Sequence, residues 1–247
     1  RPSVETILHA QMPQAFVMHT HGEVANSLTC SRGGANSFKR LKLPKYVRAV
    51  WMEYVDPGLP LAVELGKVLD KYKKESGKDA NAVFMAKHGL LVAADTDEEI
   101  RSMTAACERA VQSLAKRNKP AIDLKSEKAY RERFSDEERD TTLRLILPAL
   151  RSFLQDPSQI LRPIRDEAVD TLINLNNGRN LALAGPLSPD QVVYCGVDPL
   201  WLPIPKKLEI DAVRDNVKDA VDKFRQAHRN QDPKVLLIPG VGGYAIG

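Results

Sequence analysis

The sequence has only three cysteines, which cannot all pair in disulfides. Its three cysteines, Cys30, Cys107 and Cys195, lie far apart, and no two of them have CxxC spacing. This usage favours a reducing compartment. No apolar run reaches the ~18 residues that a membrane helix needs, and no signal peptide opens the chain. We therefore expect a soluble, cytoplasmic protein that has no membrane partner.

Long blocks of one charge are missing too, together with low-complexity segments and any evident internal repeat. The net charge of +4 is spread along 247 residues, and no aromatic-interleaved basic stripe accompanies the densest basic stretch, KYKKESGK at 71–78. A nucleic-acid partner is therefore not expected. The mild basicity suits an anionic small substrate. With 43% apolar and 28% charged residues, the composition is that of an ordinary globular protein.

The hydrophobic patterns that are present predict an α/β domain followed by a mainly helical C-terminal extension. Within residues 1–118 the patterns run helix, strand, helix, helix, strand, strand, helix, and Thr96 with Glu99 forms a capping box before the last helix. This order is typical of a layered fold in which helices flank a central β-sheet. Beyond it we expect a helical extension with a short strand at 119–205, and a helix and a buried strand at 206–247.

Three histidines are candidate metal ligands. His19 and His21 lie two positions apart on the strand predicted at 15–22, so both side chains leave the same face of the sheet. His88 ends a second predicted strand and is followed by Gly89, which allows a tight turn. Three histidines with an open fourth position are typical of a catalytic zinc site. Strand histidines can also be ordinary core or surface residues, so the pattern by itself is a weak signal.

The start of the first predicted helix contains two further candidates. Glu5 lies in its first turn, where the helix dipole stabilises a carboxylate, and it is the candidate acid/base. Ser3 lies at the N-terminus of the same helix, which is a natural phosphate site. Both residues also have purely structural interpretations, because Glu is common in first turns and Ser is a preferred N-cap. Without the histidines, Glu5 would be assigned no function.

Two long segments resemble the class II aldolase/adducin family. PSVETILHAQMPQAFVMHTHGEVANSLT is similar to the segment around the zinc site of that family, and NAVFMAKHGLLVAADTDEEI is similar to its second zinc-binding segment. YVDPGLPLA, at 54–62, resembles the link between the two. Together these segments cover roughly residues 1–118. One position departs from the family pattern, since Val4 stands where the family has the second serine of a Ser-Ser pair.

The resemblance implies a zinc-dependent aldehyde-lyase that cleaves a ketose 1-phosphate of the rhamnulose or fuculose type. In such an enzyme His19, His21 and His88 hold Zn²⁺, Glu5 is the catalytic carboxylate, and Ser3 contacts the substrate phosphate. The same fold also supports zinc-dependent sugar-phosphate epimerases and decarboxylases, as well as the non-catalytic adducin-like scaffold. Residue types do not decide between lyase and epimerase. A homo-oligomer with a small-molecule sugar phosphate as its substrate is expected, because family members are commonly tetramers.

The C-terminal part resembles the group of bifunctional rhamnulose-1-phosphate aldolase/alcohol dehydrogenase proteins. AGPLSPDQVVYCGVDPLWLP and KVLLIPGVGGYAIG are the similar segments. In that group a short-chain dehydrogenase domain follows the aldolase domain. Gly240, Gly242 and Gly247 do not fit the dinucleotide pattern G-x-G-x-x-G, so NAD is expected only in a domain beyond this chain. Both ends of the chain suggest a fragment of a longer enzyme, without the family's upstream phosphate loop and part of the aldolase domain.

Overall fold

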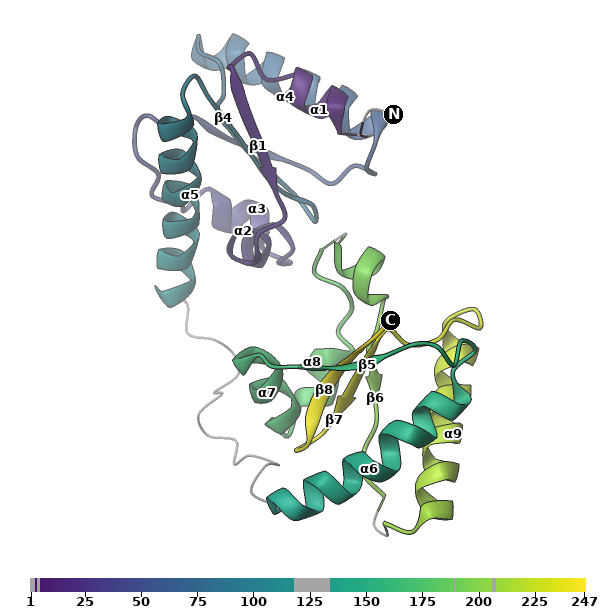
Figure 1. Ribbon diagram of the computed structural model, residues 1–247. Helices are drawn as coiled ribbons and strands as arrows, with labels where there is room; N and C mark the ends of the chain where they lie inside the picture. The colour runs from purple at the N-terminus through teal and green to yellow at the C-terminus, as the bar shows by residue number, and fades with distance from the viewer. Residues whose placement is uncertain (1–2, 4, 118–133, 189, 206–207) are drawn as a thin grey trace. The chain divides into compact units, whose positions relative to one another are not determined.

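The computed structural model describes residues 3, 5–117, 134–188, 190–205 and 208–247. Val4 and the first part of the helical extension predicted at 119–205 lie outside the described residues. The chain divides into two compact units (Figure 1). Unit 1 consists of Arg1–Ala121 and Leu187–Pro189, and unit 2 consists of Ile122–Pro186 and Asp190–Gly247. In the described part of the chain, no helix is long and apolar enough to cross a membrane.

Unit 1 is built on a four-stranded sheet with the order β1-β4-β3-β2. Its strands are β1 (Phe16–Thr20), β2 (Ala49–Met52), β3 (Ala82–Met85) and β4 (Gly89–Ala94), and its helices are α1 (Thr6–Ala10), α2 (Glu23–Thr29), α3 (Gly34–Phe38), α4 (Leu59–Ser76) and α5 (Asp97–Arg117). β4 is antiparallel to both β1 and β3, whereas β2 is parallel to β3. The seven elements predicted within residues 1–118 do not include α3 and β2, which are too short to show a period and depend on tertiary contacts.

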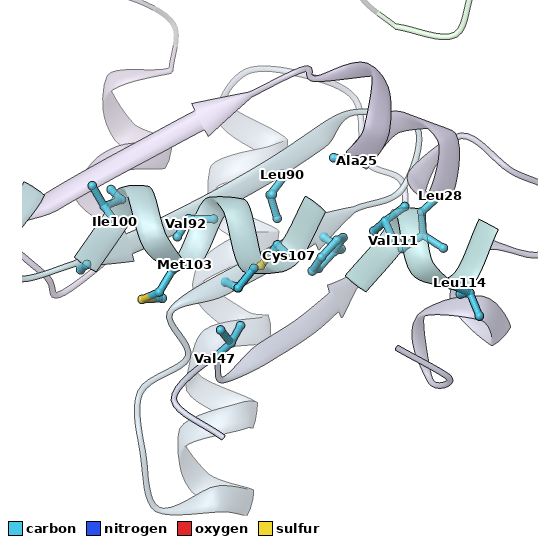
Figure 2. Close-up of a cluster of buried hydrophobic side chains, with 14 residues drawn as sticks. Ala25, Leu28, Val47, Leu90, Val92, Ile100, Met103, Cys107, Val111 and Leu114 are labelled. Atoms are coloured by element: carbon cyan, nitrogen blue, oxygen red, sulfur yellow. The ribbon is translucent and has the colours of Figure 1, made fainter. Parts of the chain in front are cut away.

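Helices cover both faces of this sheet, which explains why β3 and β4 are buried along their whole length. One core cluster joins the sheet to α2 and α5 (Figure 2), and another joins it to α1 and α4. α5 contributes Ile100, Met103, Cys107 and Val111 at helical spacing, as the sequence predicted. The layered α/β prediction for this region is confirmed.

Unit 2 also contains a four-stranded sheet, with the order β5-β8-β7-β6. Its strands are β5 (Leu161–Ile164), β6 (Leu200–Trp201), β7 (Val235–Ile238) and β8 (Gly242–Ile246), and its helices are α6 (Asp136–Phe153), α7 (Glu167–Asn174), α8 (Gly178–Ala182) and α9 (Ile210–Ala227), with one π-helical turn at Gln191–Cys195. The sequence boundary at 205 falls inside this unit, because β5 and β6 join β7 and β8 in one sheet. β8 was missed, since its glycine-rich sequence indicated a turn.

The two units have the same topology, which corrects the sequence-based view that the chain contains no repeat. Both run helix, strand, two helices, strand, helix and a strand hairpin, and α4 and α9 each contain 18 residues. β8 is antiparallel to β5 and β7, and β6 is parallel to β7, which matches unit 1 strand for strand. In each unit the pair α1–α4 or α6–α9 packs together, as do α2–α3 and α7–α8.

The correspondence extends to individual packing contacts. A Cβ added to Gly34, the first residue of α3, would lie 2.7 Å from the ring of Trp51 in β2. Gly178 begins α8 and faces Trp201 of β6 in the same way, with a Cβ 3.1 Å from its ring. In both units that Cβ would also meet the carbonyl oxygen of a leucine in the preceding helix. The two tryptophans of the chain therefore occupy equivalent positions, each beside a glycine that has no room for a side chain.

Candidate metal centre

The three predicted histidine ligands lie at one end of the sheet of unit 1, on or just after β1 and in the turn that leads into the neighbouring strand β4. His19 lies in β1, directly opposite Leu91 of β4, and His21 follows one residue after β1 ends. His88 is the last residue of the three-residue turn between β3 and β4. The sequence analysis placed His88 at a strand end and the turn at Gly89, but β3 ends at Met85 and Gly89 already belongs to β4.

The backbone of this turn explains the difference. Lys87 has a φ of 55°, in the left-handed region, and therefore cannot continue the strand. The backbone N–H of His88 donates a hydrogen bond to the carbonyl oxygen of Met85 at 3.2 Å, which closes the turn. Lys87 itself donates its N–H to the carbonyl oxygen of Thr29 at 2.9 Å. These two bonds fix the direction in which the His88 side chain leaves the chain.

Gly89 lets the two strands approach closely enough for the histidines to meet. A Cβ at this position would lie 2.5 Å from the carbonyl oxygen of Thr20 and 2.9 Å from Cδ2 of His21. It would also lie 3.3 Å from Cε1 of His19. No side chain fits there without moving β1. The glycine is therefore required by the close approach of the strand that supplies the other two histidines.

The ring nitrogens of the three histidines converge on one point, as the sequence analysis predicted. Nε2 of His19 lies 2.9 Å from Nε2 of His21 and 3.1 Å from Nε2 of His88. Four ligands arranged tetrahedrally at 2.0–2.1 Å from a zinc ion would be separated by about 3.3 Å. Together with a carboxylate oxygen of Glu5, one ligand atom from each residue lies within 4.8 Å of all the others. The donor set therefore fits a divalent metal ion.

The protonation of His19 also suits metal binding. Its Nδ1 lies 3.1 Å from the carbonyl oxygen of Leu90, which can only accept, so Nδ1 donates the hydrogen and Nε2 keeps a free electron pair toward the cluster. Burial lowers the pKa of His19 below its ordinary value, and the opposing influence of Glu5 is smaller. The neutral imidazole that a metal requires is therefore the form favoured here.

Glu5 borders the cluster from the start of α1. Its Oε1 lies 3.5 Å from Nε2 of His19 and 3.9 Å from Nε2 of His88. The Glu5 side chain is 37% exposed, whereas those of both histidines are 4% exposed. A carboxylate in this position can reach the buried nitrogens and still contact a molecule that enters from solvent. This geometry is compatible with either metal ligation or proton transfer.

The local structure around Glu5 differs from the prediction in one respect. Glu5 is the N-cap of α1 rather than a first-turn residue, and no side chain caps the helix. The Ser3 side chain does not cap the helix: its hydroxyl accepts a hydrogen bond from the backbone N–H of Glu5 at 3.2 Å, while its carbonyl oxygen accepts one from the backbone N–H of Thr6, the first residue of α1, at 3.1 Å. Because α1 has only five residues, its dipole gives Glu5 less support than the longer predicted helix would have given.

His9 is a neighbour of the cluster that the sequence analysis did not single out. Its ring lies edge-on to that of His19, with 6.5 Å between the ring centroids, and is half-buried. It lies farther from His19 than His21 or His88 does, at 4.7 and 5.0 Å, and is not part of the converging group. The sequence signal for His9 was its position four residues after Glu5, because residues four apart lie on the same side of a helix.

Comparisons with known proteins agree with this geometry. Residues 1–114 match the family described as Class II Aldolase and Adducin N-terminal domain, and residues 141–247 match the family Aldolase class II, second domain. The chain is 26% identical, over 259 residues, to the "Uncharacterized oxidoreductase YuxG" of Bacillus subtilis. That alignment covers 98% of this chain but only 36% of the relative, so the chain spans little more than a third of that protein's length.

Two solved structures are similar to part of the chain. One is the N-terminal class II aldolase domain of a conserved protein from Thermoplasma acidophilum, 31% identical, with 45% of this chain and 47% of that chain covered and a TM-score of 0.37. The other is an aldolase II superfamily protein from Pseudomonas syringae, 18% identical, with 46% and 43% covered and a TM-score of 0.34. The two family matches, one in each unit, show that the chain belongs to the class II aldolase/adducin family.

Proposed function

We propose that the chain is the aldolase part of an enzyme that cleaves a ketose 1-phosphate of the rhamnulose or fuculose type. The observation that supports this proposal is the convergence of Glu5 with His19, His21 and His88. Three imidazoles with a fourth, exchangeable position are typical of catalytic rather than structural zinc sites. A non-catalytic scaffold of the same fold would have no need for such a group of buried polar side chains, which costs stability unless they are satisfied.

In this proposal His19, His21 and His88 hold the zinc ion and Glu5 moves the proton. A bound zinc ion would supply a Lewis acid for the negative charge that develops on substrate oxygens when the C3–C4 bond of the ketose breaks. Glu5, exposed on one side and close to two of the imidazoles on the other, would transfer a proton to or from the substrate.

Ser3 is the proposed contact for the substrate phosphate. It is exposed and lies two residues before Glu5, to whose backbone N–H its hydroxyl is bonded. A hydroxyl group both donates and accepts, so the oxygen that accepts from Glu5 can still donate its hydrogen to a phosphate oxygen. A phosphate bound there would position the carbon chain of the ketose beside the Glu5 carboxylate.

The printed name of the Bacillus subtilis relative leads to a second part of the proposal. That protein is named an oxidoreductase, and this chain corresponds to 36% of it. We propose that the redox activity belongs to a dehydrogenase domain outside the segment matched here. The glycine-rich sequence of β7 and β8 supports this view, because it forms an antiparallel hairpin and not the strand, glycine turn and helix of a dinucleotide site. Residues 1–247 should therefore give no change in NADH fluorescence.

The test uses the full-length protein, purified in the presence and absence of zinc. Metal content is measured by elemental analysis, and release of dihydroxyacetone phosphate from rhamnulose 1-phosphate and fuculose 1-phosphate is followed with a coupled assay. The proposal expects one zinc ion at this site and zinc-dependent release of the three-carbon product. Conversion to an epimer or loss of CO₂ without cleavage would replace the lyase by one of the other zinc enzymes. Absence of metal binding would favour the scaffold.

A further inference from the structure

The repeat within the chain identifies which residues of unit 2 correspond to the metal centre. His19 lies opposite Leu91 in the pairing of β1 with β4, and Pro163 lies opposite Tyr244 in the pairing of β5 with β8. These two pairs are equivalent, because Leu91 and Tyr244 lie the same number of residues after the hairpin turn of their unit. His19 therefore corresponds to Pro163.

The two other histidines have equivalents as well. Residues 19–38 align with residues 163–182 without a gap, so that His21 corresponds to Arg165. Both residues come immediately before the N-cap of the next helix, α2 or α7. The β7–β8 turn has three residues, like the β3–β4 turn, and its last residue is Val241 in the place of His88.

The backbones of the two turns agree in detail. The middle residue has positive φ in both, 55° at Lys87 and 73° at Gly240. The backbone N–H of the third residue donates to the last residue of the first strand in both, at 3.0 Å from Val241 to Ile238. The hairpin that presents His88 in unit 1 therefore presents Val241 in the same way in unit 2.

These three equivalent residues all line one cleft of unit 2. The cleft has a volume of about 660 Å³ and lies between β5, the β7–β8 hairpin and α7. Pro163, Arg165 and Val241 line it from the sheet, and Asp170 and Thr171 line it from α7. A volume of this size is in the range of small-molecule sites. The cleft thus lies at the position in unit 2 that the metal centre has in unit 1.

The chemistry of the lining differs from that of the metal centre. Proline and valine cannot ligate a metal, and among the described residues of unit 2 no group of three or more His, Cys, Asp or Glu side chains offers converging ligand atoms. The carboxylates of Asp166, Glu167 and Asp170 outnumber the guanidinium of Arg165, so a phosphate is disfavoured. The same groups offer hydrogen-bond acceptors and donors together, which is what the hydroxyl groups of a sugar require.

We propose that this cleft is a second, metal-independent site of the chain, which binds a small uncharged polyhydroxylated molecule such as a free sugar or an alditol. The proposal does not depend on the lyase assignment, because it rests on the topology and the lining of unit 2. Asp170 and Thr171 contact the hydroxyl groups from α7, and Arg165 contacts them from the sheet. Asp166 serves chiefly to hold α7, since its carboxylate caps the backbone N–H groups of Ala168 and Val169.

The experiment is saturation-transfer NMR on the full-length protein with chelator present, using fructose, sorbitol and fructose 1-phosphate as probes. Transfer to fructose or sorbitol at millimolar concentration, stronger than to the phosphate, is the expected result. Thr171→Trp should abolish this transfer by filling the cleft. Ala168→Trp is the matched control, because Ala168 is an exposed residue of the same helix that does not line the cleft.

A second variant separates the cleft from the metal centre. His19→Ala, which removes a proposed zinc ligand of unit 1, should leave transfer to fructose and sorbitol unchanged. The proposal is overturned if neither neutral probe gives a signal, if Thr171→Trp binds them as Ala168→Trp does, or if His19→Ala or the chelator removes binding. Preferential binding of fructose 1-phosphate with chelator present would also contradict it, since it would show an anion site.

Discussion

Unit 1 and unit 2 share a strand order, a hairpin turn with positive φ and a glycine packed against a tryptophan, yet among the described residues only unit 1 brings together three or more side chains that could hold a metal ion. The fold determines where three side chains meet. The residue types at those three positions determine whether the meeting point can bind a metal. The comparison teaches that membership of a fold does not by itself assign chemistry, even within one chain.

The β3–β4 turn of unit 1 carries backbone strain that the equivalent β7–β8 turn of unit 2 avoids. Gly240 takes a positive φ at little cost, whereas a non-glycine residue such as Lys87 loses roughly 1–2 kcal/mol in the left-handed region. Part of this is offset by the ammonium group of Lys87, which lies 5.4 Å from the centre of the Tyr54 ring. Strain of this kind beside a proposed metal ligand such as His88 is typical of functional sites.

The largest expected effect concerns the two glutamates that are N-caps. Glu5 caps α1 and Glu209 caps α9, and neither side chain bonds to its helix. Glu5→Gln in the full-length enzyme should lower turnover by roughly 10²–10⁴-fold, because a general acid/base is lost, while zinc content stays the same. Glu209→Gln, measured in the same assay, should have near-normal turnover. Equal activity of both variants would mean that another residue transfers the proton.

The next largest expected effect is on zinc affinity, which should depend on a histidine of unit 1 but not on a histidine of unit 2. Loss of an outer partner of a ligand usually costs 10–100-fold in affinity, so loss of a direct ligand in His88→Ala should cost roughly 100-fold or more. His228→Ala removes a histidine of unit 2 that is bonded to Asp198, and it should leave affinity unchanged. Competition with a chromophoric chelator measures both. Unaltered affinity in His88→Ala would exclude His88 as a ligand.

The same comparison can be sharpened by transferring the ligands. If the positions are equivalent, the triple variant Pro163→His, Arg165→His, Val241→His should bind a second zinc ion per chain. Elemental analysis after dialysis gives the stoichiometry. A folded triple variant that binds only one zinc ion would show that the backbones of the two sites are not equivalent.

The two glycine–tryptophan contacts predict a matched loss of stability. Gly34→Ala and Gly178→Ala each force a Cβ against a tryptophan ring and a carbonyl oxygen, so each should lower the free energy of unfolding by about 1–3 kcal/mol. Gly33→Ala is the control, because a Cβ there meets nothing within 4 Å. Urea denaturation measures all three. A loss of stability in only one of Gly34→Ala and Gly178→Ala would contradict the equivalence of the two units.

The smallest effect is a difference in thiol reactivity. Burial raises the pKa of Cys107 in unit 1 to about 12, whereas Cys195 in unit 2 is exposed. Iodoacetamide at neutral pH should therefore label Cys195 in the folded protein and Cys107 only after unfolding, as read by peptide mass spectrometry. Rapid labelling of Cys107 under native conditions would contradict the packing of α5 against the sheet.

The sequence was most informative where a period or a spacing was long enough to be distinctive. The amphipathic pattern predicted α5, and the spacing of His19 and His21 predicted a shared face. The Thr96 cap was also correct, since its hydroxyl accepts from the backbone N–H of Glu99 at 3.2 Å. Such features depend on neighbours along the chain, which a sequence displays directly.

Features that depend on distant contacts were missed. β2 and β8 are short, and they become strands because they pair with β3 and β7. The sequence does not reveal the repeat, because most residues differ between the two units. Unit 2 keeps the topology of unit 1 and its glycine–tryptophan contact, in which Gly178 and Trp201 correspond to Gly34 and Trp51. The nearness of His9 to His19 depends on how α1 packs against the sheet, which no spacing between them predicts.

Anomalous diffraction at the zinc absorption edge, from crystals of zinc-loaded full-length protein, tests the central claim most directly. We predict one strong peak in unit 1, about 2.0–2.1 Å from Nε2 of His19, His21 and His88, and none in the cleft lined by Arg165 and Val241. A zinc-loaded crystal whose strongest peak lies elsewhere, or whose peak in unit 1 contacts fewer than three of these nitrogens, would contradict the assignment of the metal centre.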